Sequence, residues 1–197
     1  MISGAADWGG SHLSSPKKKR RKGSGILSNS IYLLLVIAAA FLLNSFVITR
    51  DVVSGDSMYD TLSDKDVVMI NRLTYSFSSP KRFDIVVFPD SDSLGGDIVK
   101  RIVGLPGETV RIDDEGNIYI NERLLNEHYG IETIKDPGLA SGRGITLSSD
   151  EYFVLGDNRN NSMDSRFAQI RNVKRSRIKG KVFFRILPLS SFGAVGK

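Results

Sequence analysis

The sequence contains no cysteine and only two histidines among its 197 residues. The absence of cysteine excludes a thiol nucleophile, a disulfide bond and a zinc site built on cysteine ligands. Two histidines without an HExxH pattern supply too few ligands for a histidine-bound catalytic metal. We therefore expect neither a metal ion nor another cofactor.

Scarce histidine also limits how a serine could be activated. Ser57 lies in the short stretch SGDSMYDTL, and a serine hydroxyl is a weak nucleophile until a neighbouring base, most often histidine, accepts its proton. His12 lies in a polar tail, and His128 lies in LLNEHYG, a charged stretch typical of a solvated loop. If Ser57 is a nucleophile, its base has to be sought among other side chains.

The net charge of +5 comes from two basic clusters. The first, KKKRRK at residues 17–22, lies in a Gly/Ser-rich leader without core residues, so residues 1–25 are predicted to form a disordered basic tail. The second, RNVKRSRIKGK at residues 171–181, mixes basic and apolar residues at strand-like spacing. That pattern favours a solvated sheet face over a nucleic-acid site, and no nucleic-acid partner is expected.

A long uncharged segment follows the first cluster. Residues 26–48 contain 23 residues without a charge, and as a helix they would extend about 35 Å, enough to cross a hydrocarbon core of about 30 Å. The basic residues 17–22 outnumber Arg50 and Lys65 on the other side, which places the tail in the cytoplasm and the rest outside. The sequence thus predicts a single-pass anchor in the cell membrane, in contact with lipid.

A cleaved secretory signal is the alternative interpretation of this segment. Ala38, Ala39 and Ala40 offer an A-x-A cleavage site after a basic region and an apolar run. Cleavage after Ala40 would leave FLLNSFVI as an apolar stub at the new N-terminus. The length of the segment favours an uncleaved anchor.

Residues 51–197 show no long amphipathic helical period. Short runs rich in Val, Ile, Phe and Tyr recur instead and are predicted to be strands: VVMINRLTY, FDIVVF, IVKRIVG, TVRI, NIYI, YFVLG and KVFFRIL. TVRIDDEGNIYI has the pattern of a hairpin, and residues 134–144 that of a mobile surface loop. We expect a mainly β fold, an antiparallel sheet domain outside the membrane with one N-terminal transmembrane helix.

One strand offers a base for Ser57. In DIVKRIVG, alternation places Lys100 on one face with Ile98 and Ile102, while Arg101 points the other way and can remain solvated or paired. Burial among isoleucines disfavours the charged ammonium and lowers the pKa of a lysine toward the range of a useful base. Spacing alone is also typical of an exposed Lys-Arg pair, so the pattern leaves both interpretations open.

Four segments taken together resemble a known family. SGDSMYDTL, FDIVVF, DIVKRIVGLPGETV and LGDNRNNSMDSR are similar to the successive motifs of the type I signal peptidases, in the same order, over residues 54–184. The single N-terminal anchor resembles that of many Gram-positive members. The resemblance implies that Ser57 is the acyl-forming nucleophile and that Lys100 is its general base. It also implies a hydrogen bond from Ser162 to the lysine amine and a supporting role for two further residues, Asp164 and Arg166.

Two positions depart from the family pattern. Some members carry a hydroxyl residue two positions before the nucleophile, where this chain has Gly55. The backbone N–H of Ser57 is therefore the expected donor to the oxyanion. Asp60 replaces the usual proline, which removes a restriction on φ without removing a catalytic atom.

The position of Ser57 points to the substrate. It lies nine positions after the end of the apolar segment, at most about 30 Å of extended chain, so the nucleophile is expected near the outer membrane surface. Signal peptides present a small-residue A-x-A site there. The sequence predicts a membrane-bound serine endopeptidase that removes signal peptides from exported preproteins, with an undefined oligomeric state.

Two other functions share parts of this pattern. A non-catalytic, membrane-tethered binding protein on the same scaffold would lack Ser57 or Lys100, and both are present. A self-cleaving Ser/Lys repressor would carry a DNA-binding helix-turn-helix, whereas this N-terminus carries the apolar segment. Both features favour the peptidase.

Overall fold

The computed structural model describes residues 1, 4, 24–90 and 96–196. The chain divides into two compact units, Met1–Phe41 and Leu42–Lys197. Most of the predicted tail, including the basic cluster at residues 17–22 and His12, lies outside the described residues.

The uncharged segment is largely helical. Helix α1 covers Ser24–Val47, and strand β1, Ile48–Val52, follows it directly. The first strand therefore begins three residues before the predicted start of the β domain. Among the residues that the structure describes, no helix has the length and apolar character needed to span a membrane.

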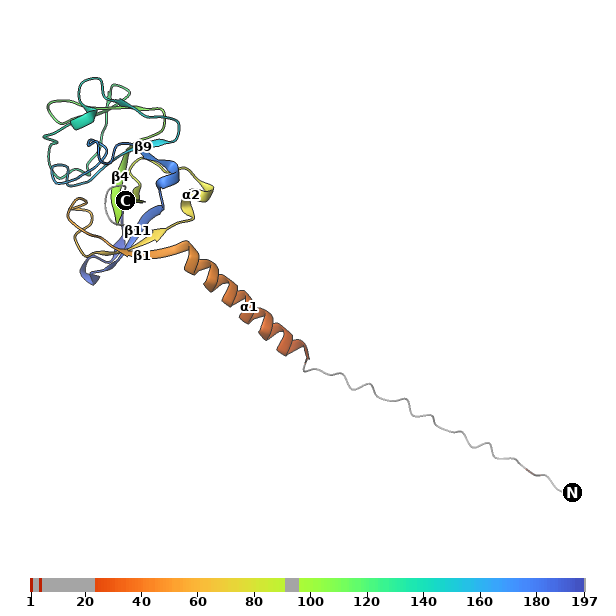
Figure 1. Ribbon diagram of the computed structural model, residues 1–197. Helices are drawn as coiled ribbons and strands as arrows, with labels where there is room; N and C mark the ends of the chain where they lie inside the picture. Colours follow the sequence, from red (N-terminus) through yellow and green to blue (C-terminus); the bar gives the residue numbers. More distant parts are fainter. Residues whose placement is uncertain (2–3, 5–23, 91–95, 197) are drawn as a thin grey trace. The chain divides into compact units, whose positions relative to one another are not determined.

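Two antiparallel sheets build the larger unit (Figure 1). The first has the order β1-β2-β11-β3-β4-β9-β10, with β12 paired to β11. Its further strands are β2 Val67–Asn71, β3 Ile85–Pro89, β4 Asp97–Gly104, β9 Glu151–Leu155, β10 Val173–Lys174, β11 Gly180–Leu187 and β12 Gly193–Ala194. The second has the order β7-β6-β5-β8, formed by β5 Thr109–Ile112, β6 Ile118–Ile120, β7 Arg123–Leu124 and β8 Ile145–Thr146. The predicted mainly β, antiparallel fold is confirmed.

The predicted hairpin is also confirmed, because β5 and β6 pair with Val110 opposite Ile120. The end of VVMINRLTY differs from the prediction: Thr74–Phe77 form a short helix, α2. The side chain of Asn71 accepts hydrogen bonds from the backbone N–H groups of Leu73 and Thr74, both at 3.0 Å, and so turns the chain out of the strand. A local side-chain bond thus overrides the strand-like composition.

Two further expectations need correction. Part of the basic stretch at residues 171–181 is a 3-10 turn, Arg175–Arg177, in which Arg175 donates to the carbonyl of Tyr75 at 2.6 Å. Residues 134–144 are not a purely surface loop, since Ile134 and Ala140 are buried in the core beside the second sheet. Ile134 at the start of the loop and Ala140 in its middle hold it against the sheet.

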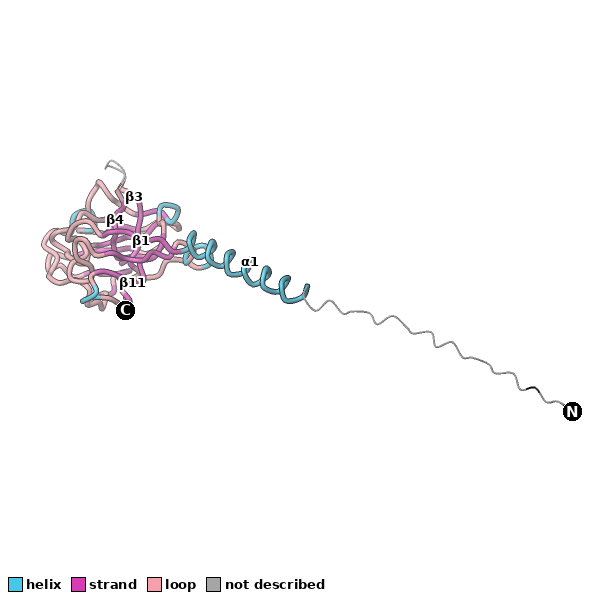
Figure 2. Tube along the Cα trace, turned by 90° about the horizontal axis from the view of Figure 1, so that it is seen from below, coloured by secondary structure: helices cyan, strands magenta, loops and turns pink. Residues whose placement is uncertain are grey.

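The strands of the larger unit pack together with loops around them (Figure 2). One core cluster brings Val68 of β2 and Ile85 and Val87 of β3 against Met58 and Leu62. The last two lie in the loop that contains Ser57. The core of the first sheet therefore fixes this loop.

Candidate active site

Ser57 lies in a loop between β1 and β2 whose two ends are hydrogen-bonded to each other. The N–H of Val53 donates to the carbonyl of Asp66 at 2.8 Å, and the N–H of Lys65 donates to the carbonyl of Val53 at 2.9 Å. Gly55 has a φ of +83°, in the left-handed region that glycine occupies without strain. The loop holds Ser57 half-buried above the sheet.

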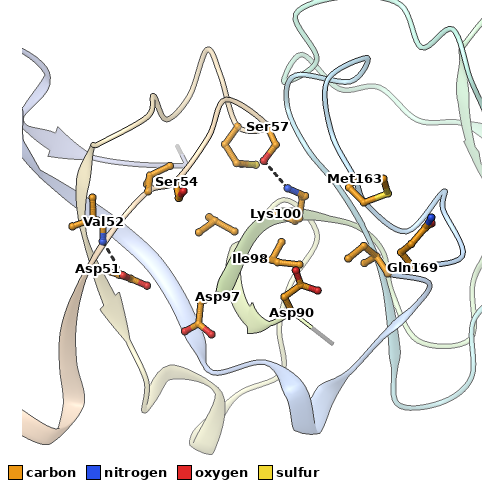
Figure 3. A pocket seen from close by; sticks show the side chains of 14 residues that line it. Asp51, Val52, Ser54, Ser57, Asp90, Asp97, Ile98, Lys100, Met163 and Gln169 are labelled. Carbon is orange, nitrogen blue, oxygen red and sulfur yellow. Dashed lines mark hydrogen bonds between the residues drawn. The ribbon is translucent and has the colours of Figure 1, made fainter. Parts of the chain in front are cut away.

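Lys100 lies on β4, opposite Val86 of β3, and is only 4% exposed. Its Nζ donates a hydrogen bond to Ser57 Oγ at 2.6 Å (Figure 3). Burial lowers the pKa of Lys100 to about 8, against the opposing effect of the carboxylates of Asp164 and Asp157. A substantial fraction of the amine is therefore neutral at mildly alkaline pH and can accept a proton from the serine hydroxyl.

A cavity of about 400 Å³ opens beside these two residues. Apolar side chains form much of its lining, and three carboxylates also line it (Figure 3). The lining includes Val53, Met58, Ile98, Met163, Ile170, Asp51, Asp90 and Asp97. Such a cavity can accept small apolar groups next to a nucleophile.

The segment after β9 contacts the Ser57 loop directly. The N–H of Asn158 donates to the carbonyl of Ser57 at 3.1 Å, and its side-chain amide donates to the carbonyl of Asp56 at 3.1 Å. A Cβ at Gly156 would collide with Ser162 Oγ and with the carbonyl of Ser57. Glycine is therefore required for this close approach.

Ser162 does not make the hydrogen bond that the family resemblance implies. Its Oγ is buried and has no hydrogen-bond partner, so the expected bond to the Lys100 amine is not formed. The amine is instead directed at Ser57 Oγ. The position of Ser162 beside Gly156 nevertheless brings its hydroxyl close to the Ser57 loop.

Asp164 and Arg166 form a buried ion pair with two hydrogen bonds, Nε to Oδ1 at 2.8 Å and Nη2 to Oδ2 at 2.9 Å. Asp164 Oδ2 also accepts from the N–H of Gly156 at 3.2 Å. Arg166 Nη1 donates to the carbonyl of Asp136 at 3.0 Å. The pair thus braces the turn that contacts Ser57.

Sequence reasoning missed a second buried ion pair. Arg101 is 1% exposed and Asp157 is 0% exposed, so Arg101 is paired and not solvated. Its Nε and Nη2 donate to Oδ1 and Oδ2 of Asp157 at 2.8 and 2.7 Å. Thr61 in the Ser57 loop also donates to Asp157 Oδ2, at 2.5 Å. The aspartate in LGDNR was the available signal for a partner of Arg101.

His128 does not line the cavity beside Ser57. It is exposed, and its ring stacks on that of Tyr129 with the ring centres 4.6 Å apart. The geometry therefore offers Lys100, and not His128, as a proton acceptor for Ser57.

Comparison with known proteins agrees with this geometry. A family model described as "Signal peptidase, peptidase S26" matches residues 27–187. The chain is 34% identical over 166 residues to "Probable signal peptidase I-2" of Synechocystis sp., which covers 82% of this chain and 73% of the relative. It is 36% identical over 155 residues to "Signal peptidase I P" of Bacillus subtilis subsp. natto, with 76% of this chain and 83% of the relative covered.

These similarities place the chain in the class of serine endopeptidases. Within it, the chain belongs to the signal peptidase family, peptidase S26. A third relative, "Signal peptidase I" of Leptolyngbya laminosa, is 32% identical over 190 residues and covers 93% of this chain and 88% of the relative. The resemblance inferred from four sequence segments is thus confirmed.

Proposed function

We propose that this chain cleaves signal peptides from exported preproteins with Ser57 as the nucleophile and Lys100 as the general base. The observation that supports the assignment most strongly is the 2.6 Å hydrogen bond between Lys100 Nζ and Ser57 Oγ in a buried setting. A depressed lysine pKa and an adjacent hydroxyl are the two requirements of a Ser/Lys mechanism.

The reaction proceeds through an acyl-enzyme. Ser57 Oγ attacks the scissile carbonyl carbon while its proton passes to Lys100 Nζ, and the backbone N–H of Ser57 donates to the oxyanion. Lys100 returns the proton to the leaving amine as the C–N bond breaks, which leaves an ester on Ser57. Water then attacks the ester, with Lys100 again accepting a proton and passing it to Ser57 Oγ.

Ser162, Asp164 and Arg166 support the site in this proposal. Once Ser57 is acylated, its Oγ carries no proton and is a poorer partner for the lysine amine. The buried hydroxyl of Ser162, which has no partner in the structure, can then hydrogen-bond the amine and orient it toward water. The buried Asp164–Arg166 pair keeps the Gly156 turn against the Ser57 loop.

The proposed substrate is a secretory preprotein with an A-x-A cleavage site. Alanine side chains fit the apolar part of the 400 Å³ cavity beside Ser57. We further propose that residues 26–48 anchor the protein in lipid as a single-pass span, with the tail in the cytoplasm and the peptidase domain outside. This anchor rests on the 23 uncharged residues and the basic cluster that precedes them.

The catalytic assignment is tested with the detergent-solubilised full chain and a purified preprotein. Ser57→Ala and Lys100→Ala should each reduce cleavage to near background in a folded protein, while His128→Ala retains most activity. Mass spectrometry of the products identifies the cut. A folded Lys100→Ala protein with full activity would disprove the assignment of the base.

The anchor is tested separately in sealed cells. External protease should digest the region after Arg50 and spare the tail, and the intact mass should show no loss of residues 1–40. A mature N-terminus at Phe41 would show instead that the segment is a cleaved signal.

A further inference from the structure

Residues 127–131, termed the strap, follow β7 and contact the turn after β9. Glu127 forms an ion pair with Arg159 at 2.6 Å. The N–H of Ile131 donates to the carbonyl of Asp157 at 3.4 Å. The strap thus contacts the turn that supports Ser57 at two points, although it comes from the end of the second sheet.

The central contact of the strap is made by Tyr129. The guanidinium carbon of Arg101 lies 3.7 Å from the centre of the Tyr129 ring. The edges of the guanidinium are bound by the carboxylate of Asp157 and, at 2.9 Å, by the carbonyl of Phe83. The ring of Phe83 in turn lies 5.0 Å from that of Tyr129. Tyr129 therefore covers a face of a guanidinium whose edges are already occupied.

The covered ion pair is connected to both members of the proposed dyad. Arg101 follows Lys100 directly on β4. Asp157 accepts from Thr61 in the Ser57 loop at 2.5 Å, and the next residue, Asn158, donates its N–H to the carbonyl of Ser57. The Arg101–Asp157 pair therefore links the strand of the base to the loop of the nucleophile.

We propose that Tyr129 is a positioning residue for signal peptide cleavage: its ring shields the Arg101–Asp157 pair from water, and this pair holds Ser57 opposite Lys100. The proposal rests on the proposed Ser57/Lys100 dyad. Tyr129 does not line the cavity, so it acts through Arg101 and not on the substrate.

The physical basis is the strength of ionic contacts in a dry environment. A cation over an aromatic face gains most when both are desolvated, and an ion pair weakens as water raises the local dielectric constant. A smaller side chain at residue 129 would open the guanidinium face to water. The pair would loosen, and the Ser57 loop would lose a constraint on its distance from Lys100.

The charges around Lys100 give this loss a measurable signature. Asp164 and Asp157 raise the pKa of Lys100, while burial and Arg166 lower it. A looser Arg101–Asp157 pair leaves the Asp157 charge less compensated and admits water, and both changes raise the pKa of Lys100. A purely structural role for Tyr129 would reduce the amount of active protein without moving this pKa.

The test compares Tyr129→Ala, Tyr129→Phe and the matched control His128→Ala in the full-length protein. His128 is exposed and stacks on the ring of Tyr129, whereas the cation–π contact with Arg101 is made by Tyr129. Tyr129→Ala should lower kcat by about tenfold or more, with KM changed little. The ascending limb of its pH profile should move to higher pH by about half a pH unit, because the pKa of Lys100 rises. The profiles of Tyr129→Phe and His128→Ala should match that of the wild type.

The position of the pH limb reports only on active molecules, so partial unfolding does not affect it. If Tyr129→Ala does not fold, Tyr129→Leu, which keeps apolar bulk without a ring face, should show the same upward shift. A wild-type limb in Tyr129→Ala or in Tyr129→Leu, whatever the value of kcat, would overturn the proposal. Ser57→Ala and Lys100→Ala are assayed in parallel, and wild-type cleavage by either would disprove the dyad itself.

Discussion

Arg101 and Asp157 form two parallel hydrogen bonds, at 2.8 and 2.7 Å, between β4 and the turn after β9. Both side chains are almost inaccessible to water. An ion pair in such a position is held in one geometry by the surrounding structure, and removal of either partner leaves a buried charge without compensation. The position of β4, which carries Lys100, relative to the Ser57 loop therefore depends on this pair.

Asp157→Asn should destabilise the protein strongly, because the guanidinium of Arg101 would remain buried without a counter-ion. The expected loss in the free energy of unfolding is about 3–5 kcal/mol, measured by urea denaturation at neutral pH. The control is Glu122→Gln, which removes the exposed partner of Arg111. This control should lose less than about 1 kcal/mol, and equal losses in the two variants would contradict the prediction.

Lys100→Met should stabilise the folded protein at neutral pH while abolishing activity. The pKa of Lys100 falls from 10.5 in the unfolded chain to about 8 in the folded protein. The unfolded state therefore binds the proton more tightly, and wild-type stability decreases as the pH falls from 10.5 to 8. Below pH 8 this penalty reaches about 3 kcal/mol, and Met does not incur it.

Urea denaturation of both proteins at pH 7 and pH 10 measures the effect. The stability advantage of Lys100→Met should be larger at pH 7, because other titrating groups contribute equally to the two proteins. An advantage that does not change with pH would show that the folded and unfolded pKa values of Lys100 are similar.

Ser162→Ala should separate stability from catalysis. Its buried hydroxyl has no hydrogen-bond partner, so its removal should leave the free energy of unfolding unchanged or slightly increased. The value of kcat should nevertheless fall by about tenfold, part of a general base contribution of about 10²- to 10⁴-fold. Steady-state kinetics on a preprotein, with KM nearly constant, test this, and an unchanged kcat would remove Ser162 from the mechanism.

The sequence predicts the parts of this protein that repeat a local pattern. Short runs rich in Val and Ile predicted the strands around Lys100 and the β5–β6 hairpin, because β-branched side chains pack well on a pleated sheet. The motifs predicted that Ser57 and Lys100 meet, although 43 positions separate them in the chain. That contact was inferred from the order of motifs and not from periodicity.

The remaining features depend on contacts that no local pattern encodes. Alternation placed Arg101 on the opposite face of the strand from Lys100. It could not show that Arg101 would be buried and paired with Asp157. Tyr129 lies in LLNEHYG, a charged stretch without strand or helix period, and its position over Arg101 follows from the path of the strap after β7. The unpartnered hydroxyl of Ser162 likewise depends on the direction of the Lys100 amine in three dimensions.

The pH dependence of kcat/KM on a signal-peptide substrate tests the central claim, that Lys100 is the base for Ser57, most directly. Activity should rise with pH along a limb near 8, the folded pKa of Lys100, as the amine becomes neutral, and His128→Ala should show the same limb. An ascending limb near the ordinary histidine pKa of about 6.5 that disappears in His128→Ala would identify histidine as the base and contradict the Ser57/Lys100 mechanism.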